Sequence, residues 1–315
     1  MIRTAVIGVG YLGRFHAQKY ANLPNSRLVG IADPSAAARS AVGAELKVAA
    51  HEDYRELLGK VDAVSIVTPT PSHFEVAKAF LEAGASVLVE KPMTVTTAEG
   101  EGLIEIAARL KRTLQVGHLE RFNAAVLAVQ PTLTVPRFIE SARLAPFKHR
   151  GTDVDVVLDL MIHDIDLILS IVRSPVVSVD AIGSSVFSKE IDIANARLRF
   201  ANGCVANATA SRVSLKTERK LRLFQDDAYL SLDLQQKILT VIRKGNGAGA
   251  DGMPQVAIEE NTYEQGDALK SEIEAFLDAV ASGGPPPVSG EDGLLALRTA
   301  VSIAEQVASS MRKFS

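Results

Sequence analysis

The sequence predicts an α/β protein in which a doubly wound parallel sheet is followed by a second, α+β domain with an open, mostly antiparallel sheet. Up to about residue 118, short apolar runs alternate with helical segments, which is the pattern of consecutive βαβ units. Beyond that point β-rich runs follow one another. Because a chain of 315 residues is long for one core, we expect roughly two domains, at residues 1–118 and 119–315.

The predicted elements of the first domain define where a ligand would bind. Its apolar runs fall at residues 3–7, 27–32, 46–50, 63–68, 86–89 and 113–116, and its helical segments include residues 72–83 and 96–111. Strands joined through helices lie parallel, so their carboxyl ends meet at one edge of the sheet. Open α/β sheets bind ligands in the crevice outside that edge.

The second domain is expected to be a sheet backed by helices. Its β-rich runs are residues 137–144, 176–187, 194–201, 204–211 and 220–234, and its helices are residues 154–172, 268–281 and 291–312. Asn202-Gly203 lies between two of these runs and is a strong signal for a β-hairpin. Residues 245–252 are expected to form a loose loop, and residues 283–287 a stiff connector.

Three glycines between the first strand and the first helix carry the strongest functional signal. They follow the pattern G-x-G-x-x-G, and an acid ends the second apolar run. The first glycine allows a tight turn, the second lets backbone approach a pyrophosphate, and the third lets the helix pack closely on the strand. The alternative is a glycine-rich turn in an unrelated α/β fold. Because strands flank the turn and an acid follows, we predict a Rossmann dinucleotide site that contains Gly8, Gly10, Tyr11, Leu12, Gly13 and Asp33.

Asp33 also favours NAD over NADP. Its carboxylate can accept hydrogen bonds from the ribose hydroxyls of the adenosine. A 2′-phosphate beside it would be repelled by up to about 4 kcal/mol at ~4 Å with an effective dielectric constant near 20. Pro34 follows directly, and no Arg or Lys occurs before Arg39. We therefore expect NAD as the cofactor.

Composition excludes several other classes of protein. A hydrophobic fraction of 47% with 23% charged residues is ordinary for a packed globular chain. The net charge of −3 and the scattered Lys and Arg residues argue against nucleic acid as a partner. A single Cys excludes a disulfide framework and a multi-cysteine metal site. Met1 leads straight into the first strand and no apolar run reaches about 18 residues, so we expect a cytoplasmic protein without a membrane segment.

The first helix of the second domain carries a polar stripe. The helix is apolar almost all round, which indicates that it is buried. Asp159, His163 and Asp166 lie at i, i+4 and i+7, and Asp155 and Ser170 extend the stripe. Buried ionisable groups are costly unless they are paired or face a cavity. We therefore expect Asp159 to accept the Nδ1–H of His163 and to leave Nε2 directed towards a substrate.

Two alternatives stay open for this stripe. It could be a buried structural cluster, or Asp159 and His163 could share a metal ion, since a carboxylate and an imidazole one turn apart suit a cation. No metal site is predicted, because the remaining histidines lie on separate elements: His16, His51, His73, His118 and His149.

The ends of two neighbouring strands in the first domain supply a further set of candidates. Lys91 lies at the carboxyl end of a strand, on the edge where ligands bind, and could donate a hydrogen bond to a substrate oxygen. The alternatives are a solvated lysine and plain turns. We expect the nicotinamide pocket to be lined by Thr68, Pro69, His73, Glu90 and Lys91.

Three motifs together resemble those of the glucose–fructose oxidoreductase/inositol 2-dehydrogenase family, called Gfo/Idh/MocA. They are the glycine fingerprint with Asp33, the segment Glu90-Lys91-Pro92, and the spacing Asp159-x-x-x-His163-x-x-Asp166. The resemblance covers essentially the whole chain. It implies a Rossmann domain and an α/β domain whose open sheet mediates assembly, as a homodimer or homotetramer. It also implies NAD(P)-dependent oxidation or reduction at a sugar or cyclitol carbon.

The same resemblance implies roles for individual residues. Lys91 would be the catalytic lysine, and Asp159 and His163 the pair that handles the substrate, with His163 as proton acceptor. Met161 departs from the family pattern, because many members have Gly between the Asp and the His. A methionine there could narrow the sugar pocket.

Two segments, residues 117–123 and 161–166, are similar to those of bacterial nucleotide-sugar 3-dehydrogenases, such as enzymes that act on UDP-N-acetylglucosamine for lipid A synthesis. Arg forks match phosphate geometry, so Arg121 and Arg212 are candidates for binding a diphosphate or uracil, unless they are exposed or salt-bridged. Competing functions are a dehydrogenase or reductase of a free sugar or inositol, and a non-catalytic NAD-binding sensor. The predicted substrate-binding residues are His118, Arg121, Asn123, Asp166 and Arg212.

Overall fold

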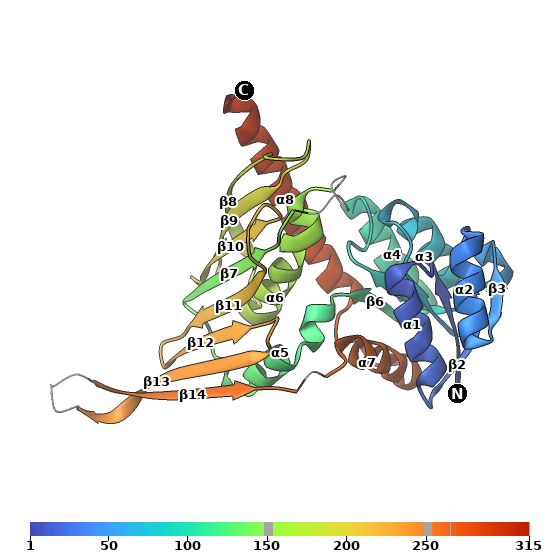
Figure 1. The fold of residues 1–315 in the computed structure, drawn as a ribbon, viewed down its shortest axis with the longest axis horizontal. Helices are drawn as coiled ribbons and strands as arrows, with labels where there is room; N and C mark the ends of the chain where they lie inside the picture. The colour runs from blue at the N-terminus through green and yellow to red at the C-terminus, as the bar shows by residue number, and fades with distance from the viewer. Residues whose placement is uncertain (148–153, 249–253, 265, 315) are drawn as a thin grey trace. The chain divides into compact units, whose positions relative to one another are not determined.

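A computed structural model describes residues 1–147, 154–248, 254–264 and 266–314. The chain divides into two compact units (Figure 1). The first unit consists of Met1–Leu119 and Asp267–Leu295, and the second of Glu120–Gly266 and Ala296–Ser315.

The first unit is built on a parallel sheet of six strands in the order β3-β2-β1-β4-β5-β6. The direction of winding reverses between β1 and β4, and such a switch point is where doubly wound sheets bind their ligands. This confirms the predicted Rossmann architecture. The strands are β1 (Ile2–Ile7), β2 (Ser26–Ala32), β3 (Ala49–His51), β4 (Ala63–Ile66), β5 (Ser86–Glu90) and β6 (Leu114–Gly117).

Helices connect these strands and cover the sheet. They are α1 (Tyr11–Asn22), α2 (Ala36–Leu46), α3 (His73–Glu82) and α4 (Thr97–Leu110), with short 3₁₀ turns η1 (Tyr54–Leu57) and η2 (Thr70–Ser72). Thr96 starts α4 with a capping box, in which its side chain accepts from the backbone N–H of Glu99 and the Glu99 carboxylate accepts from that of Thr96. The strand expected at residues 46–50 begins only at Ala49, because α2 continues to Leu46 and Lys47 ends it in the left-handed conformation.

One helix from the end of the chain packs in the first unit. Helix α7 (Ala268–Ser282) buries Ile273 and Phe276 in the same core as Val6 and Tyr20. The sequence prediction had assigned all of residues 119–315 to the second domain, whereas the structure groups residues 267–295 with the first unit. The reason is the apolar face of α7, whose burial against β1 and α1 is the driving force for this return of the chain.

The second unit contains a mixed sheet of eight strands in the order β14-β13-β12-β11-β7-β10-β9-β8 (Figure 1). Only β7 and β10 pair in parallel, so the prediction of a mostly antiparallel sheet is confirmed. The predicted hairpin at Asn202-Gly203 joins β9 to β10, and Gly203 adopts a φ of +88° there. The strands are β7 (Phe138–Leu144), β8 (Val176–Ser184), β9 (Ile193–Phe200), β10 (Val205–Ser211), β11 (Glu218–Phe224), β12 (Ala228–Asp233), β13 (Ile238–Ala248) and β14 (Pro254–Thr262).

Two strands of this sheet differ from the prediction. The single run expected at residues 220–234 is the hairpin of β11 and β12. The loose loop expected at residues 245–252 is wrong for its first part, because β13 extends to Ala248; residues 249–252 lie outside the described chain. The edge strand β14 was missed, because its described side chains from Gln255 onward are all exposed and give no alternation of polar and apolar residues.

Helices cover one face of the sheet in the second unit. Beside α5 (Ala124–Val129) lie a π-helical turn, η5 (Val157–Met161), and the helix that continues it, α6 (Ile162–Val172). Side chains of α6 and of the later part of α8 (Gly290–Phe314) share one core with inward-facing residues of the strands. Two 3₁₀ turns, η3 (Leu119–Phe122) and η4 (Gln130–Thr132), flank α5.

Candidate active site

The glycine turn after β1 has the geometry that a dinucleotide requires. Gly8 adopts a φ of +81°, and a Cβ there would lie 2.7 Å from the carbonyl oxygen of Val67. A Cβ on Gly13 would lie 1.8 Å from the Gly8 oxygen, so α1 packs directly on the turn. By contrast, a Cβ on Gly10 would meet nothing within 4 Å. The backbone is therefore tight at two positions and open at the third, as close approach of a pyrophosphate demands.

The start of α1 suits an anion. Its N-cap residue, Gly10, has no side chain to satisfy the first N–H groups, and its first turn contains no acid. Those N–H groups and the positive end of the helix dipole attract phosphate. Tyr11 and Leu12 follow directly and are 72% and 37% exposed.

Asp33 lies at the end of β2, next to this turn. One carboxylate oxygen accepts the backbone N–H of Val9 at 2.8 Å and the other that of Ser35 at 2.8 Å. Each oxygen has a further lone pair with which to accept a ribose hydroxyl. Arg39, in α2, donates to the carbonyl of Pro34 at 2.9 Å and to the carboxylate of Glu52 at 2.8 Å, so its charge is balanced by Glu52. The residues of the turn thus fit NAD.

Glu90, beside Lys91, makes a buried pair that the sequence reasoning did not foresee. Its Oε1 lies 3.2 Å from Nε2 of His16, a fully buried residue of α1. Burial opposes the charge on Glu90, but His16 and Lys91 outweigh it and lower the pKa of the carboxyl. A Cβ on Gly117 would lie 2.8 Å from the same carboxylate, so a larger residue there would displace the Glu90 side chain. The pair joins α1 to Glu90, the last residue of β5, which directly precedes Lys91.

His73 joins the loops after β4 and β5. Its Nε2 lies 2.7 Å from the carbonyl oxygen of Thr68, and its Nδ1 lies 2.9 Å from that of Pro92. Burial lowers the pKa of His73, and the two carbonyls oppose this shift without reversing it. The structure therefore brings His73 and the turn of Thr68 and Pro69 close to the Lys91–Pro92 peptide bond, which is cis. Both ring nitrogens of His73 lie against backbone carbonyls, so the residue links these two loops.

The polar stripe of the second unit lies on two kinds of helix. Asp159 belongs to the π-helical turn η5, whereas His163 and Asp166 belong to α6. The predicted hydrogen bond from the Nδ1–H of His163 to Asp159 is not formed, because the wider π-turn changes the spacing of Asp159 relative to His163. π-Helical turns are rare and frequently occur at functional sites. The helix expected at residues 154–172 therefore begins only at Val157. Asp155 precedes it and caps it, accepting from the N–H groups of Val157 and Leu158 at 2.8 and 2.9 Å.

Several predicted substrate-binding residues have partners within their own unit. Asp166 is fully buried and accepts from Nε and Nη2 of Arg121 at 2.8 and 2.6 Å, a bidentate pair. The side chain of Asn123 accepts from the N–H of Ala125 and donates to the carbonyl of Leu234, so it caps α5. His118 is buried at the end of β6.

Arg212 and Met161 also lie inside the second unit. The Arg212 side chain is 7% exposed, and its Nη2 donates to the carbonyl oxygens of Ile191 and Val154. Because these contacts occupy the Arg212 guanidinium inside the unit, we no longer expect Arg212 to bind a diphosphate. Met161 is fully buried in the hydrophobic core.

A second charged cluster was not foreseen. Arg143 donates to the Glu120 carboxylate at 2.9 Å and to the Asp164 carboxylate at 2.8 Å, and Arg219 lies 3.6 Å from Glu120. Burial opposes the charge of Arg143, but the two carboxylates outweigh it and raise its pKa. The signal in the sequence was an Arg at an inward-facing position of β7, two residues beyond buried Ser141.

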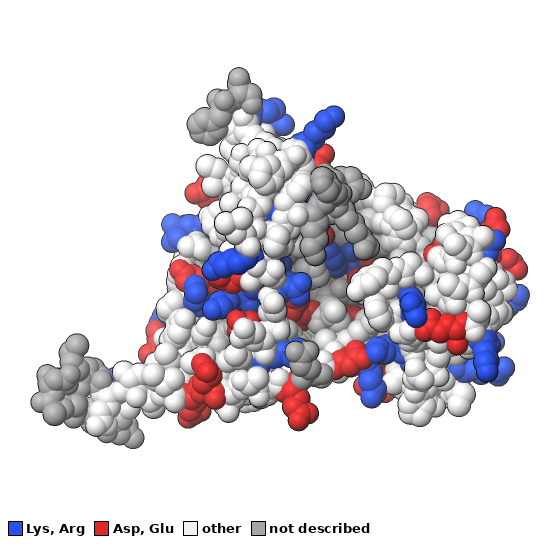
Figure 2. Space-filling view, in the orientation of Figure 1, with Lys and Arg blue, Asp and Glu red and all other residues white. Residues whose placement is uncertain are grey.

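Figure 2 shows basic side chains interspersed with acidic ones on the visible face. In the described part of the chain, no group of three or more His, Cys, Asp or Glu residues is arranged to hold a metal ion. No helix among the described residues is long and apolar enough to cross a membrane.

Two family models match the chain. The model described as an oxidoreductase family with an NAD-binding Rossmann fold matches residues 2–118. The model of the GFO/IDH/MocA C-terminal domain matches residues 126–231.

Individual relatives agree with this. The UDP-N-acetylglucosamine 3-dehydrogenase of Acidithiobacillus ferrooxidans is 41% identical over 313 residues, which is 99% of both chains. Its solved structure has a TM-score of 0.92 at 42% identity over 97% of both chains. An inositol 2-dehydrogenase of Rhizobium meliloti is 26% identical over 98% of this chain and 97% of its own. A levoglucosan dehydrogenase in complex with NADH, at 19% identity and a TM-score of 0.86 over 98% of this chain and 97% of its own, shares the fold. The chain therefore belongs to the Gfo/Idh/MocA family of NAD-binding oxidoreductases.

Proposed function

We propose that this chain oxidises the hydroxyl at carbon 3 of UDP-N-acetylglucosamine, with NAD⁺ as the hydride acceptor. The observation that carries the proposal is the identity of 41% over 99% of both chains with an enzyme of that name. In the reaction, carbon 3 loses a hydride and its hydroxyl loses a proton. The products are a 3-oxo sugar nucleotide, NADH and a proton.

The first unit would hold the cofactor. The open backbone at Gly10 and the start of α1 support pyrophosphate binding, and Asp33 supports binding of an unphosphorylated ribose. We accordingly propose NAD rather than NADP. When bound, the nicotinamide ring supplies the hydride acceptor.

In this proposal three residues handle the hydroxyl proton. His163 accepts the proton, and the negative charge of Asp159, one turn earlier, stabilises the imidazolium that forms. Lys91 stabilises the developing alkoxide and relays the proton to solvent. The Glu90 carboxylate, which accepts the backbone N–H of Lys91 at 3.3 Å, supports this arrangement because it fixes the backbone that carries the ammonium group. General acid–base catalysis of this kind contributes roughly 10²–10⁴-fold to rate.

Arg121 and His118 stay our candidates for contact with the nucleotide part of the substrate. The bidentate pair with Asp166 supports Arg121, because it holds the guanidinium plane in one orientation. In this proposal Asp166 acts through Arg121, and Asn123 shapes the start of α5. A homodimer or homotetramer, a cytoplasmic location and delivery of the 3-oxo product to lipid A synthesis stay predictions.

The activity can be tested by following the absorbance of reduced nicotinamide with UDP-N-acetylglucosamine, free N-acetylglucosamine and myo-inositol as substrates. We expect saturable turnover with the nucleotide sugar alone. Turnover with inositol instead would favour the second candidate function, that of an inositol dehydrogenase. The full-length similarity to an inositol 2-dehydrogenase supports that candidate. NADH binding without turnover of any polyol would indicate a sensor.

The residue roles need variants with matched controls. We expect Lys91→Met and His163→Ala to lower kcat by roughly 10²–10⁴-fold while NADH still binds. Lys111→Met alters the residue that ends α4, away from the proposed site, and should leave kcat unchanged. Wild-type kcat in Lys91→Met or His163→Ala would refute the assigned role.

A further inference from the structure

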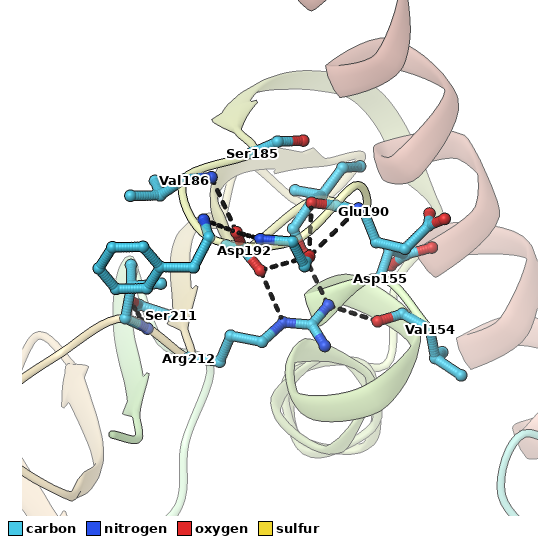
Figure 3. A network of polar contacts seen from close by, with 12 residues as sticks. Val154, Asp155, Ser185, Val186, Glu190, Asp192, Ser211 and Arg212 are labelled. Atoms are coloured by element: carbon cyan, nitrogen blue, oxygen red, sulfur yellow. Dashed lines mark hydrogen bonds and ion pairs between the residues drawn. The ribbon is translucent and has the colours of Figure 1, made fainter. Parts of the chain in front are cut away.

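The carboxylate of Asp192 organises the loop that precedes β9 (Figure 3). One oxygen accepts the backbone N–H groups of Val186, Phe187 and Ser188 at 2.7, 2.7 and 2.9 Å. The other accepts the hydroxyl of Ser188 at 2.7 Å. Asp192 is fully buried, so this loop is folded around a single ionised group.

Arg212 connects that carboxylate to another segment of the chain. Its Nε lies 3.3 Å from Oδ1 of Asp192, and its Nη2 donates to the carbonyl oxygens of Ile191, at 2.9 Å, and Val154 (Figure 3). Two backbone hydrogen bonds connect the same segments. The N–H of Arg212 donates to the carbonyl of Asp192, and the N–H of Val156 donates to the carbonyl of Ile191, both at 2.9 Å.

Residues 154–156 are the segment from which η5 begins. The Asp155 carboxylate caps the first N–H groups of that turn, and the N–H of Asp159 donates to the carbonyl of Asp155 at 3.0 Å. Any shift of Val154 or Val156 is therefore transmitted to Asp159 within one turn. The guanidinium of Arg212 holds the segment through its contact with the Val154 carbonyl.

We propose that Arg212 is a positioning residue: together with Asp192 it fixes the start of the π-helical turn that carries Asp159, and so the position of Asp159 relative to His163, without itself contacting the substrate. The proposal rests on the catalytic roles given above to Asp159 and His163. It replaces the role in diphosphate binding that the sequence indicated for Arg212.

The choice of variant follows from burial. The side chains of Arg212 and Asp192 are 7% and 0% exposed, and removal of one member of a buried pair leaves the other charge uncompensated. Truncation to Ala could therefore prevent folding. Arg212→Lys keeps the charge but loses the planar fork, so one ammonium cannot reach Asp192 and both carbonyls together. Asp192→Asn keeps the shape and removes the charge.

The test measures kcat, KM for UDP-N-acetylglucosamine and binding of UDP by calorimetry in both variants. A misplacement of about 1 Å can cost roughly 100-fold in rate, so we expect kcat to fall roughly 10- to 100-fold while KM and the Kd for UDP change by less than about 3-fold. The pH profile of kcat/KM should also shift, because the surroundings of His163 change. Arg137→Lys, which alters an exposed bidentate pair with Asp226, is the matched control.

Three results would overturn the inference. A tenfold or greater rise in KM and in the Kd for UDP at unchanged kcat would make Arg212 a substrate ligand. Loss of thermal stability at unchanged kcat and pH profile would make it structural only. Loss of kcat in the Arg137→Lys control would make the effect unspecific. Asp159→Asn separates the two proposals: if it keeps wild-type kcat, the proposed catalytic pair fails, whereas if it loses kcat and Arg212→Lys does not, only positioning fails.

Discussion

Substitution of Asp33 by Ser should change the preference of the enzyme between NAD and NADP. Serine keeps an oxygen that can accept the N–H of Ser35, so the turn after β2 is retained. The substitution removes the negative charge that faces the 2′ position of the adenosine ribose in our proposal. The substitution should therefore lower the affinity for NAD and remove the electrostatic repulsion of NADP.

The size of the effect follows from two contributions. Loss of hydrogen bonds from ribose hydroxyls to a charged acceptor costs about 1.5–3 kcal/mol. Repulsion of one phosphate charge at ~4 Å is up to about 4 kcal/mol at an effective dielectric constant near 20, and less at a site such as Asp33 that is half-buried and reached by solvent. Together they should shift the ratio of affinities by about 3 kcal/mol, which is roughly 100-fold.

The assay is calorimetric titration of the wild type and the variant with NADH and NADPH, since the chain contains no Trp to report binding by fluorescence. Asp53→Ser is the matched control. Like Asp33, Asp53 accepts the N–H of the residue two positions ahead, that of Arg55 at 2.9 Å, but it lies at the start of η1 and not at the cofactor turn. The control should keep the wild-type ratio. An Asp33→Ser ratio within about 3-fold of the wild type would refute the electrostatic argument for NAD.

Further predictions concern the turn, its neighbouring loops and Asp192. Gly10→Ala should fold with an unchanged Tm and bind NADH more weakly. Gly13→Ala should also bind NADH more weakly, and it should lose about 3 kcal/mol of stability because its Cβ would lie 1.8 Å from a carbonyl oxygen. His73→Phe leaves one half-buried carbonyl, that of Thr68 or of Pro92, without its donor and should cost about 1–3 kcal/mol, measured by urea unfolding. Burial opposes ionisation of Asp192, but the hydrogen bonds from Ser188, Phe187 and Val186 outweigh it and lower its pKa to about 2 from an ordinary 3.8. Its contribution to stability is therefore complete above about pH 4 and is lost as the pH falls through about 2, a dependence that Asp192→Asn should not share.

Each of these predictions has a contradicting result. A lower Tm in Gly10→Ala would mean that the space above that residue is not open. Normal stability of Gly13→Ala would mean that α1 can move away from the turn. Unchanged unfolding of His73→Phe would mean that water satisfies the carbonyl. An acid profile of Asp192→Asn identical to that of the wild type would assign the loss to other carboxylates.

The cofactor turn could be predicted from the sequence because its physics is local. Gly8 is required by its own positive φ and Gly13 by its contact with the Gly8 carbonyl oxygen, both within the strand–turn–helix segment, and Asp33 follows at the end of the adjacent strand. The parallel strands were likewise recognised from continuous apolar runs, since both faces of β1 and β4 are buried. The observed six-stranded order agrees with this reading.

The partners of the buried charges could not be predicted, because they come from residues far apart in the chain. Arg121 meets Asp166, and Arg212 meets Asp192, through pairings that depend on the complete fold of the second unit. The sequence therefore indicated Arg212 as a candidate ligand of a diphosphate or uracil, or as a salt-bridged residue, but could not show that its partner is Asp192. The packing of α7 in the first unit could not be predicted for the same reason. The amphipathic pattern of a helix shows that one face is buried but not against which core.

The π-helical turn and the edge strand were missed for different reasons. Periodicity treats residues 154–172 as one α-helix, whereas Asp159 lies in a turn with wider hydrogen bonding. Strand β14 has no buried face in its described side chains, so it lacks the alternation by which half-buried strands are recognised.

Transfer of an isotopic label would test the proposed reaction most directly. UDP-N-acetylglucosamine that carries deuterium at carbon 3 is incubated with the wild-type protein and NAD⁺, and the reduced cofactor is analysed by mass spectrometry. Our account predicts that the NADH formed carries the deuterium, and that substrate labelled at carbon 4 gives unlabelled NADH. Unlabelled NADH from the first substrate, or no NADH at all, would contradict it.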